Sequence, residues 1–364
     1  MGIVLSEKYS LYSGKSVLVT GHTGLKGSWL SLWLQKLGAK VIGYALDPND
    51  ANDNFVRARV GEKLTDIRGD IRDFDKLSHV FAGHTPEIVF HLAAQPLVRE
   101  GYREPKETFD VNIGGTVNVL EACRQTPSVK AVVVVTSDKC YLNNGKAAPY
   151  REGDRLGGND PYGASKACAE IVAHAYEQSF FRWNAAAGRG LGFATVRAGN
   201  VIGGGDWSKD RIVPDCIRSL SSGQIIKIRN PRHTRPWQFV LEPLAGYLLL
   251  AAHLHEQPEK FSGAWNFGPD PEANVPVTDL VEEIIAAYGM GSWLAETDPG
   301  QPLESHSLAL DATKAAKKLK WRPVLSLKQA VEMTVDWYKD AEANHDLHDF
   351  ALSQIEAYAA KLNK

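Results

Sequence analysis

Short, continuous apolar runs alternate with segments of helical periodicity through the first 200 residues of the chain. Such runs are typical of strands that are buried on both faces, as in a parallel sheet between two layers of helices. In the helical segment at 28–38, apolar residues recur at three- and four-residue spacing. The pattern predicts an α/β fold with a doubly wound parallel sheet. We expect strands at 15–20, 39–46, 63–70, 86–94, 131–137 and 192–200, and further long helices at 108–124 and 162–180.

The pattern changes after Asn200, where segments become shorter and richer in Pro, Trp and Arg. One further apolar run, at 264–269, has the character of a strand that returns to the main sheet. We therefore expect a larger domain of residues 1–202 plus 236–268, and a smaller, discontinuous C-terminal lobe of residues 203–235 plus 269–364. Ligands of open parallel sheets bind beyond the carboxyl ends of the strands, so the cleft between the lobes is the expected active site.

Composition narrows the possible classes of function. The 364 residues include 41 Lys and Arg against 43 Asp and Glu, and a formal net charge of -2 gives no general attraction to nucleic acid. No apolar run reaches about 18 residues, so we expect no membrane-spanning helix. The four cysteines form no CxxC pair and are expected to be reduced, as in a cytoplasmic protein. His345 and His348 have no third ligand in view, which favours a solvated helix face over a metal site.

A glycine-rich turn, GHTGLKG at 21–27, follows the first predicted strand and opens the first helix. Glycines at 21, 24 and 27 would let a pyrophosphate approach backbone N–H groups at the positive end of that helix. Asp47 ends the second strand about 20 residues later, where a carboxylate can bind an adenosine ribose and disfavour a 2′-phosphate. This arrangement predicts a Rossmann-type domain that binds NAD. A solvated or helix-capping Asp47 is the alternative.

Several chemically active side chains surround the fifth predicted strand. The run ends in Ser137, Asp138 and Lys139, which places a hydroxyl, a carboxyl and an amine at one sheet edge. Tyr162 and Lys166, within PYGASK, stand four residues apart and therefore on one face of a helix. A nearby ammonium favours tyrosinate and should lower the pKa of a phenol that is otherwise about 10. A tyrosine–lysine pair alone is common, but the glycine loop and the hydroxyl-ended strand make a catalytic interpretation specific.

The chain resembles the extended short-chain dehydrogenase/reductase family over nearly its whole length. The motifs that carry the resemblance occur in that family's order: GHTGLKG, the turn GDIRD, HLAAQ at 91–95, Asn112, the strand ending in Ser137, and YGASK. WRPVLSLKQAV at 321–331 is similar to the family's C-terminal tail. The resemblance implies NAD held by Gly21, Thr23, Gly24, Leu25, Lys26, Gly27, Asp47, Asp70, Ile71, Leu92, Ala93, Ala94, Asn112, Tyr162 and Lys166.

Within that family, the chain resembles the sugar-nucleotide 4,6-dehydratases, and in particular the branch that acts on CDP-glucose. TSDKCYLN, RAGNVIGGGDW and RNPRHTRPWQFVLEPLAGYL carry this narrower resemblance. It implies oxidation of glucose at C4 by Tyr162 with Lys166 and Ser137, elimination of water across C5 and C6, and return of hydride to C6. The more familiar dTDP-glucose dehydratases have Glu where this chain has Lys139.

Elimination needs a proton donor at C6 and a proton acceptor at C5. We expect Asp138 to be the acid and Lys139 to be the base, or an assistant to it. Free lysine has a pKa of about 10.4, so Lys139 would need desolvation in a closed cleft to accept a proton at neutral pH. The alternative is that Lys139 only pairs with Asp138 and keeps it ionised.

The stretch RNPRHTRPWQF at 229–239 could supply cations for a substrate diphosphate. Arg232 and Arg235 stand close to Trp237, and guanidinium groups suit phosphate oxygens. A solvated basic loop is the alternative, although the RPWQ context favours a substrate role for Arg235. Spacing does not decide which residue reads cytosine. Further expected substrate contacts are Gln95, Asn200, Arg211 and Trp237.

Two other functions share part of this pattern. A sugar-nucleotide C4 epimerase would have the glycine loop and the tyrosine–lysine pair but would not need the Asp138–Lys139 couple. A dinucleotide-binding scaffold would ordinarily lose the tyrosine or the lysine, and both are present. The resemblance further implies a homodimer through the helices at 108–124 and 162–180, with a tetramer of dimers as the larger alternative. It also implies a cytoplasmic role in making precursors of bacterial surface polysaccharide (O-antigen).

Overall fold

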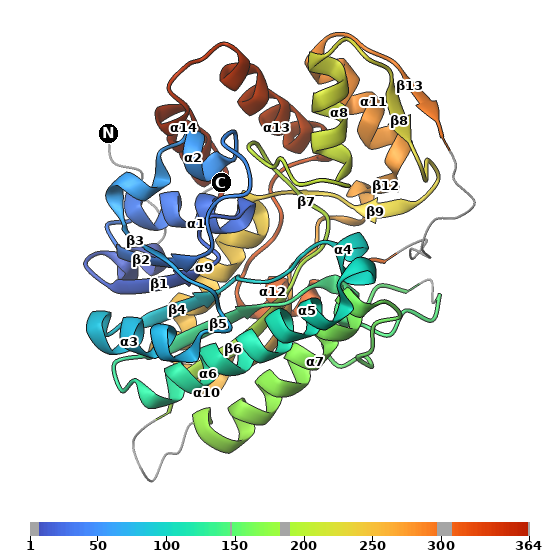
Figure 1. The fold of residues 1–364 in the computed structure, drawn as a ribbon. Coiled ribbons are helices and arrows are strands. Elements are labelled where there is room, and N and C mark those ends of the chain that lie inside the picture. The colour runs from blue at the N-terminus through green and yellow to red at the C-terminus, as the bar shows by residue number, and fades with distance from the viewer. Residues whose placement is uncertain (1–6, 146–147, 183–189, 297–307, 363–364) are drawn as a thin grey trace.

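The computed structural model describes residues 7–145, 148–182, 190–296 and 308–362. At its centre is a seven-stranded sheet in the order β11-β6-β5-β4-β1-β2-β3, in which all neighbouring strands are parallel (Figure 1). The predicted fold class is confirmed, and the run at 264–269 does return to the sheet, as β11 beside β6. The strands are β1 (Ser16–Thr20), β2 (Lys40–Ala45), β3 (Thr65–Arg68), β4 (Ile88–His91), β5 (Ala131–Val135), β6 (Gly192–Arg197) and β11 (Gly263–Asn266).

Successive strand residues point into two separate cores. Val17 and Val19 of β1 pack on one face with α1 and α9, whereas Leu18 packs on the other face with α3, α6 and α7 (Figure 1). Because both faces are covered, the strands are apolar throughout, which explains why the sequence shows runs rather than alternation. The covering helices are α1 (Leu25–Lys36), α9 (Leu241–Glu256), α3 (Phe74–His84), α6 (Gly115–Gln125) and α7 (Pro161–Tyr176).

The two long predicted helices each contain a π-helical stretch. The helix expected at 108–124 consists of α5 (Pro105–Phe109), a π-helical turn (Asp110–Gly114) and α6. The helix expected at 162–180 is α7, continued by a second π-helical turn (Glu177–Phe181). Such turns occur frequently at functional sites, and the first one contains Asn112. The spacing of apolar residues in the sequence did not reveal the extra residue that such a turn contains.

Several short strands after β6 form two-stranded sheets beyond the carboxyl ends of the main strands (Figure 1). Their strands pair as β7 (Val201–Ile202) with β10 (Gln238–Phe239), β8 (Ile226–Ile228) with β13 (Trp293–Ala295), and β9 (Thr234–Pro236) with β12 (Asn274–Pro276). The accompanying helices are α8 (Ile212–Ser221), α11 (Val277–Tyr288) and α13 (Leu327–Glu342). The remaining helices are α2 (Asn54–Arg57), α4 (Val98–Arg103), α10 (Pro258–Phe261), α12 (Thr313–Lys318) and α14 (Leu347–Leu362).

The last helix, α14, packs against α1 at the N-terminal half of the chain. The ring of Tyr358 meets the edge of Trp33 at a centroid distance of 5.8 Å. Because α14 belongs to the predicted C-terminal lobe and α1 to the larger domain, this contact does not mark a boundary between them. The limits of the two lobes stay a prediction.

The prediction of a solvated helix face at the two C-terminal histidines is wrong, because His345 is exposed but lies in the connection between α13 and α14, and His348 lies on α14 but is buried. His348 is 7% exposed and hydrogen-bonds through Nδ1 to the Ala58 carbonyl at 2.9 Å, because α14 docks on the N-terminal half. His345 is exposed and pairs with Asp340. Within the described ranges, no group of three or more His, Cys, Asp or Glu is placed to hold a metal ion, and no helix is long and apolar enough to span a membrane.

Candidate active site

A pocket of about 710 Å³ runs along the carboxyl ends of the parallel strands. The chain passes from β1 through β2 and β3 on one side and continues with β4, β5 and β6 on the other, so this pocket lies at the switch point of the sheet. One wall is formed by the glycine turn and the ends of β4 and β5, and the other by the segments around α8, β8 and β9. Of the site residues expected from the sequence, all but Asn112 and the candidate cation Arg232 line this pocket.

The glycine turn after β1 forms a cradle without side chains. Gly21 has a φ of +73°, and a Cβ there would lie 2.7 Å from the backbone nitrogen of Ala93. A Cβ at Gly27 would lie 2.0 Å from the Gly21 carbonyl oxygen, so α1 can approach the turn only with glycine at this position. The first N–H groups of α1 have no partner within the helix, and Gly24, Leu25 and Lys26 line the pocket. These residues fit a pyrophosphate.

Two carboxylates lie towards the other end of the cradle. Asp47, just after β2, exposes 86% of its side chain and stands 3.5 Å from Arg68 Nε. Asp70 accepts hydrogen bonds from the Nε and Nη2 atoms of Arg72 at 3.0 and 2.6 Å, and these bonds hold the pKa of Asp70 below its usual value. Arg72 thus fixes the orientation of one carboxylate, while the other remains open to a ribose hydroxyl.

Asn112 supports the pocket from behind. It is 1% exposed, its Oδ1 accepts from the Gln95 N–H at 2.8 Å, and its Nδ2 donates to the Gln95 carbonyl and to Ser165 Oγ. Asn112 therefore ties the segment after β4 to α7. The sequence predicted that Asn112 contacts the cofactor; in the structure it contacts Gln95, which lines the pocket, and Ser165, which does not.

Tyr162 and Lys166 lie side by side on the first turns of α7, below β5. Burial raises the pKa of Tyr162 to about 12, although a hydrogen bond with Ser137 opposes the shift. Burial lowers the pKa of Lys166 to about 8, and its Nζ donates to the Val135 carbonyl at 3.3 Å. The prediction of a lowered phenol pKa is thus wrong for the protein alone, because desolvation outweighs the hydrogen bond with Ser137 and the charge of Arg211.

Asp138 occupies a place that only glycine leaves open. It is 3% exposed, accepts from Ser137 Oγ at 2.9 Å, and lies 3.5 Å from Asn200 Nδ2. A Cβ at Gly199 would lie 1.9 Å from Asp138 Oδ2. Sequence reasoning missed Gly199; the only signal was a glycine between the sixth strand and Asn200. Lys139 lines the same pocket, and within the described part of the chain no ion pair joins it to Asp138.

A buried ion pair underlies the catalytic end of the pocket. Arg197 Nε and Nη2 donate to the two carboxylate oxygens of Glu170 at 2.9 and 2.7 Å, and both side chains are 3% exposed. The hydroxyl groups of Thr136 and Thr195 also donate to Glu170. The pair joins α7 to β5 and β6 one turn beyond Lys166. Sequence reasoning missed it, although a glutamate four residues after Lys166, on the buried face of a helix, was a usable signal.

The opposite wall carries the expected cations. Arg211 Nη1 pairs with Asp206 Oδ2 at 2.8 Å, and the charge of Asp206 raises the pKa of Arg211. Arg235 of β9 lines the pocket, as does Trp237, whereas Arg232 does not. The structure thus brings Arg211, Arg235 and Trp237 to face the glycine turn and the end of β5.

A model of the protein family described as GDP-mannose 4,6 dehydratase matches residues 18–334. The chain belongs to this family. The match begins in β1 and ends in α13, so it includes the glycine turn, the end of β5, the tyrosine–lysine pair and the opposite wall of the pocket.

The relatives of this chain include dehydratases and epimerases. CDP-glucose 4,6-dehydratase of Salmonella typhimurium is 49% identical over 350 residues, which are 96% of this chain and 97% of that protein. The solved dTDP-glucose 4,6-dehydratase of Bacillus anthracis in complex with NAD has a TM-score of 0.75 at 21% identity, over 91% of this chain and 99% of its own. UDP-glucose 4-epimerase of Thermotoga maritima with UDP-glucose has a TM-score of 0.76 at 24% identity, over 90% and 99%.

The resemblance to sugar-nucleotide dehydratases and the Rossmann-type fold are thereby confirmed. Since one of the two similar structures is a dehydratase and the other an epimerase, the fold by itself does not select the reaction. The side chains at the end of β5 have to do so.

Proposed function

We propose that this protein is a CDP-glucose 4,6-dehydratase, which converts CDP-glucose to CDP-4-keto-6-deoxyglucose and water. The observation that carries the proposal is the placement of Asp138 and Lys139 in the same pocket as Tyr162 and Lys166. An elimination needs this additional acid and base, whereas epimerisation at C4 does not. The Salmonella typhimurium relative supports cytidine as the nucleoside.

The cofactor proposed for the glycine turn is NAD. When bound, NAD supplies an acceptor for the hydride at sugar C4 and returns that hydride to C6. The turn and the N-terminus of α1 would hold the pyrophosphate. Asp47 would accept from the adenosine ribose, and Asp70 with Ile71 would border the adenine. Leu92, Ala93 and Ala94 would complete the cofactor wall.

Oxidation at C4 uses the residues at the start of α7. Tyr162 accepts the proton of the C4 hydroxyl, and Ser137 aligns that hydroxyl through its own Oγ. Because the pKa of Tyr162 is about 12 in the protein alone, the phenol is protonated at neutral pH. The phenol must therefore release its own proton to solvent before it can accept the proton of the C4 hydroxyl. Lys166, which shares one helix face with Tyr162, stabilises the tyrosinate.

The elimination uses the residues at the end of β5. A keto group at C4 makes the C5 proton acidic, and Lys139 accepts that proton. Asp138 donates a proton to the C6 hydroxyl, which leaves as water. The absence of an ion pair between these two side chains in the described structure favours separate roles over a simple charge pair.

The second wall of the pocket would bind the rest of the substrate. Arg235 is placed to meet the diphosphate, because guanidinium groups bind phosphate oxygens in a bidentate manner. Arg211 lies near Tyr162 and would contact the sugar or the phosphate next to it. Gln95, Asn200 and Trp237 also line the pocket as further substrate contacts.

Incubation of the purified protein with CDP-glucose in deuterated water, followed by NMR of the sugar, tests the proposal. A 4-keto-6-deoxy product with deuterium at C5 is expected. Formation of CDP-galactose would instead support the epimerase. Conversion of dTDP-glucose or GDP-mannose in parallel, with CDP-glucose unchanged, would overturn the nucleotide assignment and leave the reaction type in place.

We also propose the assembly and the division of the chain. A homodimer through α6 and α7 is supported by partly exposed apolar residues on α7, among them Ile171, which is 59% exposed.

The two-lobe division, with 203–235 plus 269–364 as the substrate lobe, is supported by β8–β13 and β9–β12, which pair the separated stretches. Four cysteines without disulfides support a reducing, cytoplasmic setting.

A further inference from the structure

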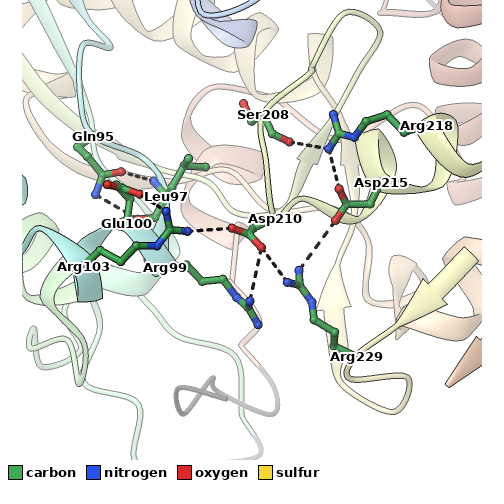
Figure 2. Close-up of polar contacts among 10 residues, drawn as sticks. All are labelled: Gln95, Leu97, Arg99, Glu100, Arg103, Ser208, Asp210, Asp215, Arg218 and Arg229. Carbon is green, nitrogen blue, oxygen red and sulfur yellow. Dashed lines mark hydrogen bonds and ion pairs between the residues drawn. The ribbon is translucent and has the colours of Figure 1, made fainter. Parts of the chain in front are cut away.

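A single carboxylate joins the two walls of the pocket (Figure 2). Asp210 lies 3.5 Å from Arg99 Nη1, 3.4 Å from Arg103 Nη2 and 2.8 Å from Arg229 Nη1. Arg99 and Arg103 belong to α4, which follows β4 on the cofactor side. Arg229 directly follows β8 on the opposite side. We call these four residues the Asp210 clasp.

Further polar contacts continue the clasp into both walls of the pocket (Figure 2). On the cofactor side, Gln95 Oε1 accepts from the N–H of Leu97, immediately before α4. On the other side, Arg229 lies 3.9 Å from Asp215, which pairs with Arg218 at 2.6 Å. The segment that carries Gln95 is thus connected to α8 through Asp210, Arg229 and Asp215.

The clasp lies at the edge of the pocket and not only on the outer surface. Arg99, Asp210 and Arg229 line the pocket, and Asp210 immediately precedes Arg211. The Asp210 side chain is 25% exposed. Burial opposes its ionisation, but the hydrogen bond from Arg229 and the charges of Arg229, Arg99 and Arg103 hold the pKa of Asp210 below its usual value. The carboxylate is therefore negative throughout the neutral range.

The backbone at Asp210 is unusual as well. Its φ is +61°, a left-handed conformation that Asp and Asn adopt more readily than other non-glycine residues. The conformation directs one carboxylate towards three guanidinium groups from two separate segments. Glu100 also pairs with Arg103, at 2.9 Å, and Asp215 lies 3.9 Å from Arg229. Without Asp210, however, the three guanidinium groups would lose the one carboxylate that they share, and the repulsion between them would increase.

We propose that Asp210 is a positioning residue. It holds α4, on the cofactor side of the pocket, against the segment that carries Arg229 on the opposite side, and so sets how tightly the pocket encloses its substrate. The clasp acts through binding, since the residues assigned to the chemistry lie on β5 and α7. This inference rests on the proposed function only for the choice of substrate.

Asp210→Asn is the decisive variant, because Asn tolerates the left-handed backbone and keeps the shape of the side chain while removing its charge. We expect KM for CDP-glucose to rise by about five- to tenfold, in the range of a lost charge network, with kcat within about twofold. Salt screens both the ion pairs of the clasp and the repulsion in the variant, so the ratio of the two KM values should approach one as ionic strength increases.

A second substitution tests the repulsion directly. Arg103 is 62% exposed and does not line the pocket. Arg103→Gln alone should change KM by less than about twofold, as expected for an exposed pair. In the Asp210→Asn background, however, Arg103→Gln removes one of the repelling charges and should lower KM again. The double variant should therefore have a lower KM than Asp210→Asn, whereas a simple loss of contacts would raise KM further.

Asp346→Asn is the matched control. Asp346 pairs with Arg59 at 2.8 Å and also joins segments far apart in the sequence, but neither residue lines the pocket. Its KM should equal that of the unchanged protein. A lower KM for Asp210→Asn would overturn the proposal, since it would mean that Asp210 competes with the substrate for the arginines. An unchanged KM would also overturn it.

Hydrogen exchange without nucleotide separates this inference from the proposed function. Amides in 98–103 and 207–215 should exchange faster in Asp210→Asn than in the unchanged protein or in Asp346→Asn. If CDP-glucose is not converted but these amides exchange faster, the substrate assignment fails and the clasp stands. Unchanged exchange in both segments would overturn the clasp whatever the substrate.

Discussion

At the scale of single residues, the position of Asp138 depends on an atom that is absent from its neighbour. Asp138 can lie against Asn200 because Gly199 has no side chain, and a Cβ there would overlap Asp138 Oδ2 at 1.9 Å. The clash involves the end of a side chain and not the backbone. Asp138 would therefore move while the fold stays intact.

Gly199→Ala should lower the turnover of CDP-glucose by about 100-fold, because a misplacement of about 1 Å at the reacting centre can have an effect of that size. The unfolding midpoint should change little. Gly83→Ala is the matched control, since a Cβ at that position on α3 meets nothing within 4 Å. Steady-state kinetics and thermal unfolding of both variants check this, and full activity of Gly199→Ala would contradict the role given to Asp138.

Lys139→Met should separate oxidation from elimination. The variant retains Tyr162, Lys166 and Ser137, so hydride transfer from C4 remains possible, but the acceptor for the C5 proton is lost. We expect the absorbance of reduced nicotinamide to accumulate upon addition of CDP-glucose, with no 4-keto-6-deoxy product in NMR spectra. Lys76→Met, on the exposed side of α3, controls for loss of a lysine. Normal product formation by Lys139→Met would show that another group is the base.

At the scale of secondary-structure elements, buried carboxylates connect helices that the sequence separates. Glu242 on α9 is 1% exposed, accepts from the N–H groups of Val324 and Leu325 at 2.9 and 2.8 Å, and accepts from Tyr358 Oη at 2.8 Å. Burial raises the pKa of Glu242 to about 7 despite these three bonds. The carboxyl group therefore binds a proton more tightly in the folded chain than in the unfolded one.

This shift has a defined effect on the pH dependence of stability. The folded pKa of about 7 exceeds the unfolded value of 4.5, so the protonated carboxyl favours folding below pH 4.5, and that contribution is lost as the pH rises through 7. Glu242→Gln keeps the acceptor oxygen and removes the titration. Relative to the unchanged protein, the variant should gain on the order of 2–3 kcal/mol in unfolding free energy between pH 5 and pH 8.

Urea denaturation at several pH values checks the Glu242 prediction. Glu282→Gln, on the exposed side of α11, is the control and should follow the unchanged protein at every pH. If the Glu242→Gln curve also runs parallel to that of the unchanged protein, the buried carboxyl is not the group that titrates.

At the scale of the whole molecule, the pocket and the proposed dimer depend on opposite faces of the same helices. Tyr162 and Lys166 point from α7 to the pocket, whereas Ala164, Cys168, Ile171 and Ala175 form a partly exposed apolar stripe on that helix. α6 and α7 lie next to each other on one face of the sheet (Figure 1). A second copy packed on this stripe would remove it from water and would hold α7 in place.

Ile171→Glu should convert the proposed dimer to monomers, because the dimer would then bury a negative charge in an apolar contact where that charge has no partner. Sedimentation velocity of the variant and the unchanged protein measures this. Ile225→Glu, at a position 51% exposed just before β8, is the control. A dimer that persists in Ile171→Glu would place the interface elsewhere, and a monomeric unchanged protein would refute the dimer.

The sheet and the order of the motifs could be read from the sequence alone, and nearly all residues that it predicted for the site do line the pocket. Strands buried on both faces are apolar throughout, and a glycine turn after a strand is local, so both features can be read without the fold. Since parallel strands end at one edge, residues after β4, β5 and β6 were bound to meet. Except for Asn112 and Arg232, the predicted site residues line the pocket, and those that follow β4, β5 and β6 do so for this reason.

Features that depend on burial and on contacts between distant segments became apparent only in the folded chain. Burial reversed the expected pKa shift of Tyr162, and a π-helical turn directed Asn112 to the backbone of Gln95. Clearance at Gly199 and the convergence of three arginines on Asp210 join residues up to 130 positions apart (Arg229 and Arg99, 229 − 99). Hydrophobic periodicity records only which face of an element is buried, and it carries no information about which distant side chain meets it there.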